Sequence, residues 1–462
     1  MILSEVFQQF VKESPVCVMV RATLENVLSA ERVDNLFART AVRQRPSELL
    51  FSTVADVMSL VVCRIRPSVH AAYQARAESF QVSLAALYDK LQGIEVNVSR
   101  TLVRETSERM GAIVRQTGGA LPELLPGYRV LIADGNHFPA TERRLKELRT
   151  RNVAPLPGHA VVLFDPALML AVDVLPCADG HASERTLLPA LLERLEAKDL
   201  LIADRNFYTT RFLLDIDRRG AFFLIRQHGS SLKYELVGRR RKIGRIDRGQ
   251  VYEQEMRLLG AHDETQVIRR TTIKLDEPTR NGDEEIHVLS NLPAAIKPLK
   301  LAKLYRQRWT VEGAFQEMEA HLKSEIETLA YPQAALFAFC LALVSYNVLS
   351  VVKAALRGAH GHDKIENEVS SYYLADEVAA VSRGMTILLP GDFWHERFAT
   401  QTPSQVAQFL LACARQVRLS AFRKHPRGPK KKPPPNSKTK QGRGHVATQR
   451  IINARKSTPA TH

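Results

Sequence analysis

The first 125 residues carry apolar positions at the three- and four-residue spacing of amphipathic helices. The clearest examples are the runs SELLFSTVADVMSLVVCRI and VSRTLVRETSERMGAIVRQ. Pro and Gly residues separate these runs, as they do between helices. The pattern predicts a helical N-terminal domain over residues 1–125.

From Leu125 the pattern changes to short apolar runs of strand length. YRVLIADG, HAVVLFDP and MLAVDVLP each predict a strand, and ASERTLLPALLERLEAK predicts a helix after them. DLLIADRNF, TTRFLLDIDRRG and AFFLIRQ then predict strand, helix and strand. Strands interleaved with helices in this way indicate an α/β fold with a mixed sheet and flanking helices.

Residues from about 227 to 298 interrupt that rhythm with short strand-like pieces and turn residues, and they predict a β-rich insertion. A helix is predicted after it, in KLAKLYRQRWTVEGAFQEMEAHLKSEIE. The stretch Ala334 to Val352 is long and apolar enough to span a membrane but contains Ser, Tyr and Asn. We expect a buried core helix there rather than a membrane span.

Composition narrows the class of protein. A chain of 462 residues with 45% hydrophobic and 25% charged residues predicts at least two packed domains. Its five cysteines are scattered and form no CxxC pair, which argues against a disulfide framework or a cysteine zinc site. The start, MILSEVFQQFVKE, shows no secretory signal, so we expect a reducing compartment.

The net charge of +16 is concentrated at one end of the chain. Residues 423–462 hold twelve Lys and Arg and no acid, which leaves only +4 for the first 422 residues. This composition predicts a disordered basic tail that attracts a polyanion, with nucleic acid as the first candidate and a solubilising tail as the alternative. Residues 1–123 hold 14 basic and 13 acidic residues, so composition gives no DNA-binding signal there.

Two acids follow apolar strands in the same way, Asp134 in IADG and Asp204 in IADR. Carboxylates at the carboxyl ends of neighbouring strands lie at the edge of the sheet, where α/β folds bind ligands. Together they suit a hard cation such as Mg²⁺. The alternative is that each aspartate caps the turn that follows it.

The helix after the insertion offers a third carboxylate. At about 100° per residue, five polar side chains fall within about 60° on one face: Tyr305, Arg308, Glu312, Glu319 and Lys323. Such a stripe is typical of a solvated face with ion pairs. The Gly313 within it favours a functional face instead, because a helix tolerates glycine better where something packs closely.

The combination of DGNHF, ADRNFY and Tyr305-x2-Arg308-x3-Glu312 resembles the hairpin-forming DDE transposases of bacterial insertion sequences. The resemblance runs from about Val130 to Glu325. It implies an RNase H-like mixed sheet with flanking helices and a β-rich insertion before the last catalytic helix. The implied domains are a helical, candidate end-binding domain (1–125), a catalytic domain (126–422) and the tail.

The resemblance also implies roles for individual residues. Asp134, Asp204 and Glu312 would be catalytic ligands of two Mg²⁺ ions, with Mn²⁺ as a substitute. The implied or candidate DNA contacts are Tyr305, Arg308, Lys323, Arg239, Arg240, Arg241 and Lys242, with the run ERRLKELRTR after Asp134 as a further candidate. Lys323 enters because the family pattern places a lysine where this chain has Glu319.

The activity implied is metal-dependent excision of an insertion sequence, followed by strand transfer into target DNA. The expected partner is double-stranded DNA, bound by a homodimer in the bacterial cytoplasm with no membrane. Family members use an aromatic in the insertion to hold a flipped base. Trp309 and Trp394 both lie outside it, so Tyr234 and Tyr252 are the available aromatics. The alternatives are an RNase H-like nuclease or resolvase without strand transfer, and a DNA-binding relic of a transposase.

Overall fold

The computed structural model describes residues 2–44, 49–76, 82–137, 158–179, 182–227, 233–261, 264–279, 282–326, 329 and 331–425. The basic run ERRLKELRTR and the tail beyond residue 425 therefore lie outside the described residues.

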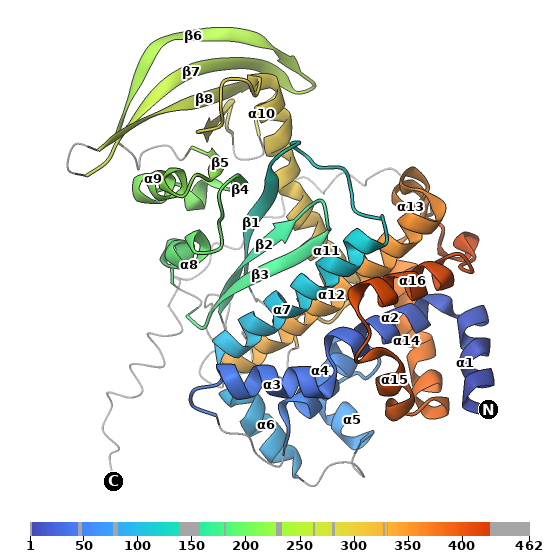
Figure 1. The fold of residues 1–462 in the computed structure, drawn as a ribbon. Helices are drawn as coiled ribbons and strands as arrows, with labels where there is room; N and C mark the ends of the chain where they lie inside the picture. The colour runs from blue at the N-terminus through green and yellow to red at the C-terminus, as the bar shows by residue number, and fades with distance from the viewer. Residues whose placement is uncertain are drawn as a thin grey trace, which may run out of the picture.

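The N-terminal part is helical over its described residues, as the periodicity predicts. Its helices are α1 (Ile2–Glu13), α2 (Pro15–Val27), α3 (Ala30–Thr40), α4 (Phe51–Val62), α5 (Val69–Gln74), α6 (Leu84–Gly93) and α7 (Val96–Gln116). In Figure 1, α7 runs alongside a long helix from the second half of the chain and under the sheet.

The sheet contains nine strands and is mixed, which confirms the strands predicted from the apolar runs. They are β1 (Arg129–His137), β2 (His159–Asp165), β3 (Leu170–Cys177), β4 (Asp199–Ala203), β5 (Phe222–Arg226), β6 (Tyr234–Ile246), β7 (Gly249–Leu259), β8 (Thr265–Leu275) and β9 (Glu285–Ser290). The strand order is β3-β2-β1-β4-β5-β9-β8-β7-β6. Strands β1, β4 and β5 are parallel neighbours, and the other pairs are antiparallel.

Helices cover both faces of the central strands, which explains why these strands read as continuous apolar runs. Successive residues of a strand point to opposite faces. Val130 and Ile132 of β1 join the larger core with α7, whereas Leu131 and Ala133 join a second core. The second core is formed with α8 (Leu188–Leu192) and α9 (Thr210–Arg218).

One helix is shorter than the sequence predicts. The run ASERTLLPALLERLEAK forms a 3-10 turn, η4 (Glu184–Leu187), followed by α8 of only five residues. Pro189 lies at the start of α8. Because proline lacks an amide hydrogen and fits only the first turn of an α-helix, one helix cannot run through this position.

The strand-like pieces of the predicted insertion extend the same sheet. Strands β6 to β9 add to β5 at one edge, and the turn region after β9 leads into α10 (Pro298–Tyr305). Leu299 and Ala302 of α10 pack in a small core against Ile246 and Val251. The insertion is therefore in direct contact with the helical segment that follows it.

The remaining helices return to the N-terminal part. They are α12 (Pro332–His360), α13 (His362–Glu368), α14 (Ser371–Leu388), α15 (Gly391–Phe398), α16 (Pro403–Ala414) and the turn η7 (Leu419–Phe422). They share one core with α1 to α7, and the buried Asn26 Nδ2 of α2 donates to Phe398 O at 2.6 Å. The boundaries at residues 125 and 422 remain predictions, and helices from both sides of residue 125 meet in this core.

Helix α12 contains the membrane-like stretch. It is long and apolar enough to cross a membrane, yet 94% of its most apolar window is buried inside the protein. It is the central core helix of the helical part, as expected for this stretch.

Candidate active site

Asp134 and Asp204 lie side by side where the parallel pairing of β1 with β4 stops. Asp204 directly follows β4, but β1 continues past Asp134 to His137, so the prediction that this strand ends at its acid was wrong. The register pairs Ala133 of β1 with Ala203 of β4, so the two aspartates follow at equivalent positions. Each carboxylate accepts a hydrogen bond from the next backbone N–H, Asp134 Oδ1 at 3.1 Å and Asp204 Oδ1 at 2.6 Å. The capping contact considered as an alternative is present at Asp204, which caps η5 (Arg205–Phe207), but not at Asp134, which lies inside β1.

A helical segment brings Glu312 to the same place. After α10 the chain passes through a 3-10 turn, η6 (Arg306–Arg308), into α11 (Trp309–His321). Arg308 Nη1 lies 3.1 Å from Asp134 Oδ2, and Arg308 Nη2 lies 2.6 Å from Glu312 Oε1. One guanidinium thus joins a strand-end carboxylate to the helix carboxylate.

The 3-10 turn changes the helix face that a continuous α-helix would present. Three residues of 3-10 helix rotate the chain by about 60° more than three residues of α-helix. Side chains three apart then eclipse each other, which brings Arg308 over Tyr305. The buried Tyr305 and the nearly buried Arg308 therefore meet beneath the acids.

The electrostatics show that the three carboxylates are close. Burial raises the pKa of Asp134 to about 7; Arg308 opposes the shift, and the negative charges of Glu312 and Asp204 add to it. Burial likewise raises the pKa of Tyr305 above its ordinary value, while the Arg308 charge lowers it. A positive charge among these acids would lower the cost of keeping them ionised.

The donor set fits a hard divalent cation, although the described residues contain no group of three His, Cys, Asp or Glu already arranged to hold one. Only carboxylate oxygens are offered, and the negative charges of Glu312 and Asp204 add to the burial that raises the pKa of Asp134. Arg308 supplies the compensating charge in this arrangement.

One expectation about the helix face was wrong. α11 ends at His321, so the predicted stripe does not extend to Lys323. Lys323 Nζ instead donates to Pro67 O at 2.8 Å, and the exposed Glu319 lies at the last turn of α11. A Cβ on Gly313 would meet no atom of the described residues within 4 Å, and the functional role of this face stays a prediction.

The basic run of the insertion lies on β6, the edge strand of the sheet. Arg240 pairs with Glu285 at 2.9 Å and stacks 4.0 Å from the Tyr252 ring centre, and Arg241 pairs with Glu253 at 3.3 Å. The flanking Arg239 and Lys242 are exposed. All four lie on this exposed edge strand, where a backbone of phosphates can approach, and their role as DNA contacts stays a prediction.

The structure places two further residues near the carboxylates that the sequence analysis did not identify as functional. Arg226 ends β5, the next parallel strand, and its guanidinium lies 2.8 Å from Asp283. The run AFFLIRQ carries the signal, because it ends in a charged residue as the two aspartate strands do. Trp309 opens α11 beside Arg308 and is 47% exposed.

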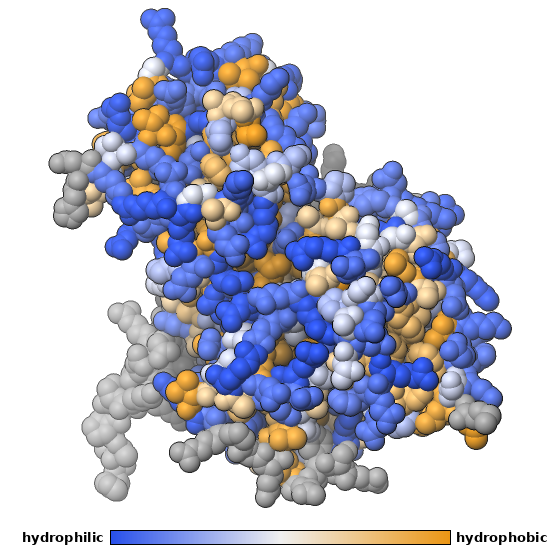
Figure 2. Space-filling model, in the orientation of Figure 1, coloured by the Kyte–Doolittle hydropathy of each residue, from blue (hydrophilic) through white to orange (hydrophobic). Residues whose placement is uncertain are grey.

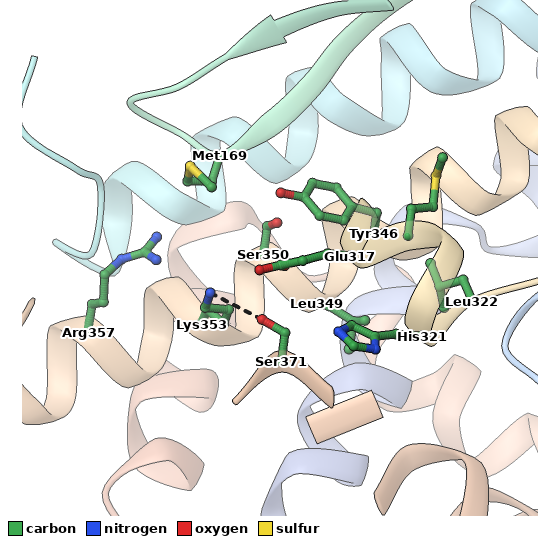
Figure 3. Close-up of a pocket in the computed structure, with 11 residues that line it drawn as sticks. Met169, Glu317, His321, Leu322, Tyr346, Leu349, Ser350, Lys353, Arg357 and Ser371 are labelled. Carbon is green, nitrogen blue, oxygen red and sulfur yellow. Dashed lines mark hydrogen bonds between the residues drawn. The ribbon is translucent and has the colours of Figure 1, made fainter. Parts of the chain in front are cut away.

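The other side of α11 is fixed to the helical core. Figure 3 shows Glu317 and His321 directed into a small cavity that also receives Tyr346 and Lys353 from α12. Lys353 Nζ donates to Ser371 Oγ of α14 at 3.3 Å. Glu317 lies about 140° around the helix from Glu312, so α11 connects the acids on one side to the core on the other.

Comparison with known proteins gives one family. No curated protein matches the chain. Residues 125–348, a little less than half of the chain, match the family model described as "Transposase DDE domain". This range contains β1 to β9 and the residues Asp134, Asp204 and Glu312. Over this range the chain is therefore similar to the transposase DDE domain, which supports a DDE transposase.

Proposed function

We propose that this chain is a DNA transposase that excises an insertion sequence and joins it to target DNA. The observation that carries the proposal is the meeting of three carboxylates: Asp134 and Asp204 on neighbouring parallel strands, each directly after the last pair of their register, and Glu312 joined to Asp134 through Arg308. The match to the transposase DDE domain covers all three.

Asp134, Asp204 and Glu312 would hold two Mg²⁺ ions, which Mn²⁺ can replace. Bound there, the ions supply activation of the attacking oxygen and stabilisation of the leaving oxygen. The carboxylates themselves balance the cations and form no bond to DNA. Arg308 and Tyr305 would release the acids and bind the phosphate at the element end, as in the hairpin-forming group.

The reaction is an in-line displacement at phosphorus. A water oxygen attacks, the bond from phosphorus to the 3′ oxygen breaks, and that oxygen takes a proton to leave a 3′-hydroxyl and a 5′-phosphate. The freed 3′-hydroxyl then attacks a second phosphodiester, so one phosphodiester bond forms for each one that breaks. Excision and joining therefore use the same displacement with different nucleophiles.

Double-stranded DNA is the proposed partner, bound as element ends and as target by a homodimer in the bacterial cytoplasm and nucleoid, without a membrane. A groove in the helical part supports DNA binding there. It lies between α3 and α7, on a face whose visible surface is largely hydrophilic (Figure 2). Its charged lining is Arg32, Arg39, Arg104, Arg109, Arg194, Glu105 and Glu108.

This clustering is invisible in the composition of residues 1–123, which is nearly neutral. Burial lowers the pKa of Arg109, and the nearby positive charge of Arg32 lowers it further. Guanidinium groups in a fixed groove suit phosphate oxygens. The groove is thus a candidate contact for element ends.

The test uses a donor plasmid carrying the DNA that flanks the reading frame. Asp134→Asn, Asp204→Asn and Glu312→Gln should each abolish excision while leaving DNA binding within about threefold of wild type. Normal excision by any variant would remove that residue from the mechanism. Cleavage by the wild type without joined product would favour a nuclease or resolvase, and binding without cleavage would favour a relic.

A further inference from the structure

A fourth carboxylate lies against both strand ends of the candidate site. Glu184 belongs to η4, the short turn before α8, and is half-buried. Its Oε2 accepts a hydrogen bond from Asn206 Nδ2 at 3.2 Å. A Cβ built on Gly135 would fall only 1.9 Å from its Oε1, so the carboxylate rests on the glycine backbone.

These two contacts involve the segments that orient Asp134 and Asp204. The N–H of Gly135 donates to the Asp134 carboxylate, so a shift of this peptide turns that carboxylate. Asn206 lies in the turn η5 (Arg205–Phe207), whose first N–H donates to the Asp204 carboxylate. One side chain thus touches both the β1 residue after Asp134 and the turn after Asp204, beyond the point where the described register of β1 with β4 ends at Ala133 and Ala203.

The neighbouring residue strengthens the contact. Arg185 Nε donates to the backbone oxygen of Asn206 at 3.1 Å. Asn206 is thereby held at its side chain by Glu184 and at its main chain by Arg185. Because Pro189 prevents one continuous helix here, the preceding residues form the short η4 turn. Glu184 and Arg185 of this turn make the two contacts to Asn206.

We propose that Glu184 is a positioning residue of the site. It links the end of β1 after Asp134 to the turn η5 after Asp204 and so fixes the separation of the two carboxylates. Its use in metal binding rests on the proposed function. Its effect on these two segments follows from the contacts alone.

The contact pattern decides which variants are informative. Glu184→Ala removes both contacts, and Asn206→Ala removes the hydrogen bond from the other side. Glu184→Gln keeps an oxygen that accepts from Asn206 and nearly the same shape, while it removes the charge. Glu193→Ala is the matched control, because Glu193 directly follows α8 and is exposed.

The first measurement is amide hydrogen exchange of the full chain without metal or DNA. Glu184→Ala and Asn206→Ala should each speed exchange in residues 134–137 and 204–208 at least threefold. Glu184→Gln and Glu193→Ala should stay within twofold of wild type. The Glu184→Ala/Asn206→Ala double variant should add little to either single variant, because both remove one interaction.

The second measurement is Mn²⁺ affinity of the same proteins by electron paramagnetic resonance. Loss of a residue that orients metal ligands weakens affinity about tenfold or more, so we expect this of Glu184→Ala and Asn206→Ala but not of Glu184→Gln. Unchanged exchange in Glu184→Ala would overturn the proposal. So would a Glu184→Gln variant as weak as Glu184→Ala with wild-type exchange, because Glu184 would then act through its charge as a ligand.

A further variant separates this inference from the proposed function. If Asp134→Asn binds Mn²⁺ as well as wild type does, the proposed metal chemistry fails. The exchange measurement still decides whether Glu184 holds the end of β1 and the turn η5 together.

Discussion

At the scale of single residues, Arg308 occupies the carboxylates of Asp134 and Glu312 when no metal is bound. Its guanidinium contacts Asp134 and Glu312, and its side chain is only 12% exposed. A metal ion bound by the same carboxylate oxygens would have to compete with this guanidinium for negative charge. The ion pairs and the metal are therefore alternatives at one site.

Arg308→Ala should tighten Mn²⁺ binding by the DNA-free protein, by on the order of tenfold, because it frees two carboxylates. It should also lower the free energy of unfolding in metal-free buffer above pH 7, where Asp134 is ionised, by about 3 kcal/mol, the typical cost of leaving one buried charge unpaired. Titration by electron paramagnetic resonance and chemical denaturation measure the two effects.

The matched control for this experiment is Arg306→Ala in the same turn. Arg306 pairs at 3.1 Å with Asp247, which is 83% exposed, so its loss should change neither quantity. Equal Mn²⁺ affinities of wild type and Arg308→Ala would contradict competition at the acids.

Asp134 should make stability depend on pH. Its folded-state pKa of about 7 exceeds the unfolded value of about 3.9. The folded protein therefore holds the extra proton between about pH 4 and 7, and stability falls as pH rises through this window. At about 1.4 kcal/mol per pKa unit, Asp134→Asn should be more stable than wild type at pH 8 by on the order of 2–4 kcal/mol.

That advantage should vanish at pH 4, where Asp134 is protonated in the folded protein. Denaturation in metal-free buffer at several pH values measures it. Asp363→Asn is the control, because the Asp363 side chain is fully exposed. A constant difference between Asp134→Asn and wild type from pH 4 to 8 would refute the shifted pKa.

At the scale of elements, one arginine ties the insertion to the segment that carries Tyr305. Arg269 of β8 donates to Glu253 Oε1 at 2.8 and 2.6 Å. The same guanidinium donates to the carbonyl oxygens of Pro293 at 2.9 Å and Ile296 at 2.7 Å, in the loop before α10. The β-rich insertion thereby holds the start of the helical segment that leads to Arg308.

Arg269→Lys should loosen this segment, because an ammonium cannot reproduce the planar fork of donors. We expect the free energy of unfolding to fall by about 3 kcal/mol and amide exchange in residues 292–305 to speed up. Arg257→Lys is the control, since its ion pair with Glu235 is exposed on both sides and contributes about 0–1 kcal/mol. Wild-type exchange in residues 292–305 of Arg269→Lys would show that the insertion does not support α10.

The sequence predicts the helices and strands better than the turns and contacts that join them. The central strands follow from apolar runs, and the neighbouring positions of Asp134 and Asp204 follow from the same pattern of an acid after three apolar residues. The largely exposed β6 carries no apolar run and was not predicted, and β1 continues past the acid that was expected to end it. The contact between Arg308 and Asp134 joins residues 174 positions apart and depends on the η6 turn, for which helical periodicity carries no signal. The wrong prediction for Lys323 has the same cause, because the helical periodicity continues past His321, where α11 ends.

At the scale of the whole molecule, positive charge lies in separate places. The groove between α3 and α7 and the β6 edge belong to the described residues. The basic tail begins where the chain is still anchored: Lys424 N donates to Glu368 O, and Arg423 pairs with Val369. Arg423 and Lys424 are therefore tied to the end of α13, and ten of the twelve tail cations follow residue 425.

Removing residues 426–462 should therefore weaken DNA binding through charge alone and leave the fold intact. If all ten cations neutralise phosphates, the slope of log K against log salt should fall by up to about 9, at roughly 0.9 per phosphate. The melting temperature should stay at the wild-type value, because the anchored residues 423–425 remain. Affinity for duplex DNA at several salt concentrations measures the slope.

A full-length variant with the tail order scrambled is the control, and it should keep the wild-type slope because its charge is unchanged. An unchanged slope after truncation would make the tail a solubilising segment and leave DNA binding to the groove, the β6 edge and the active site.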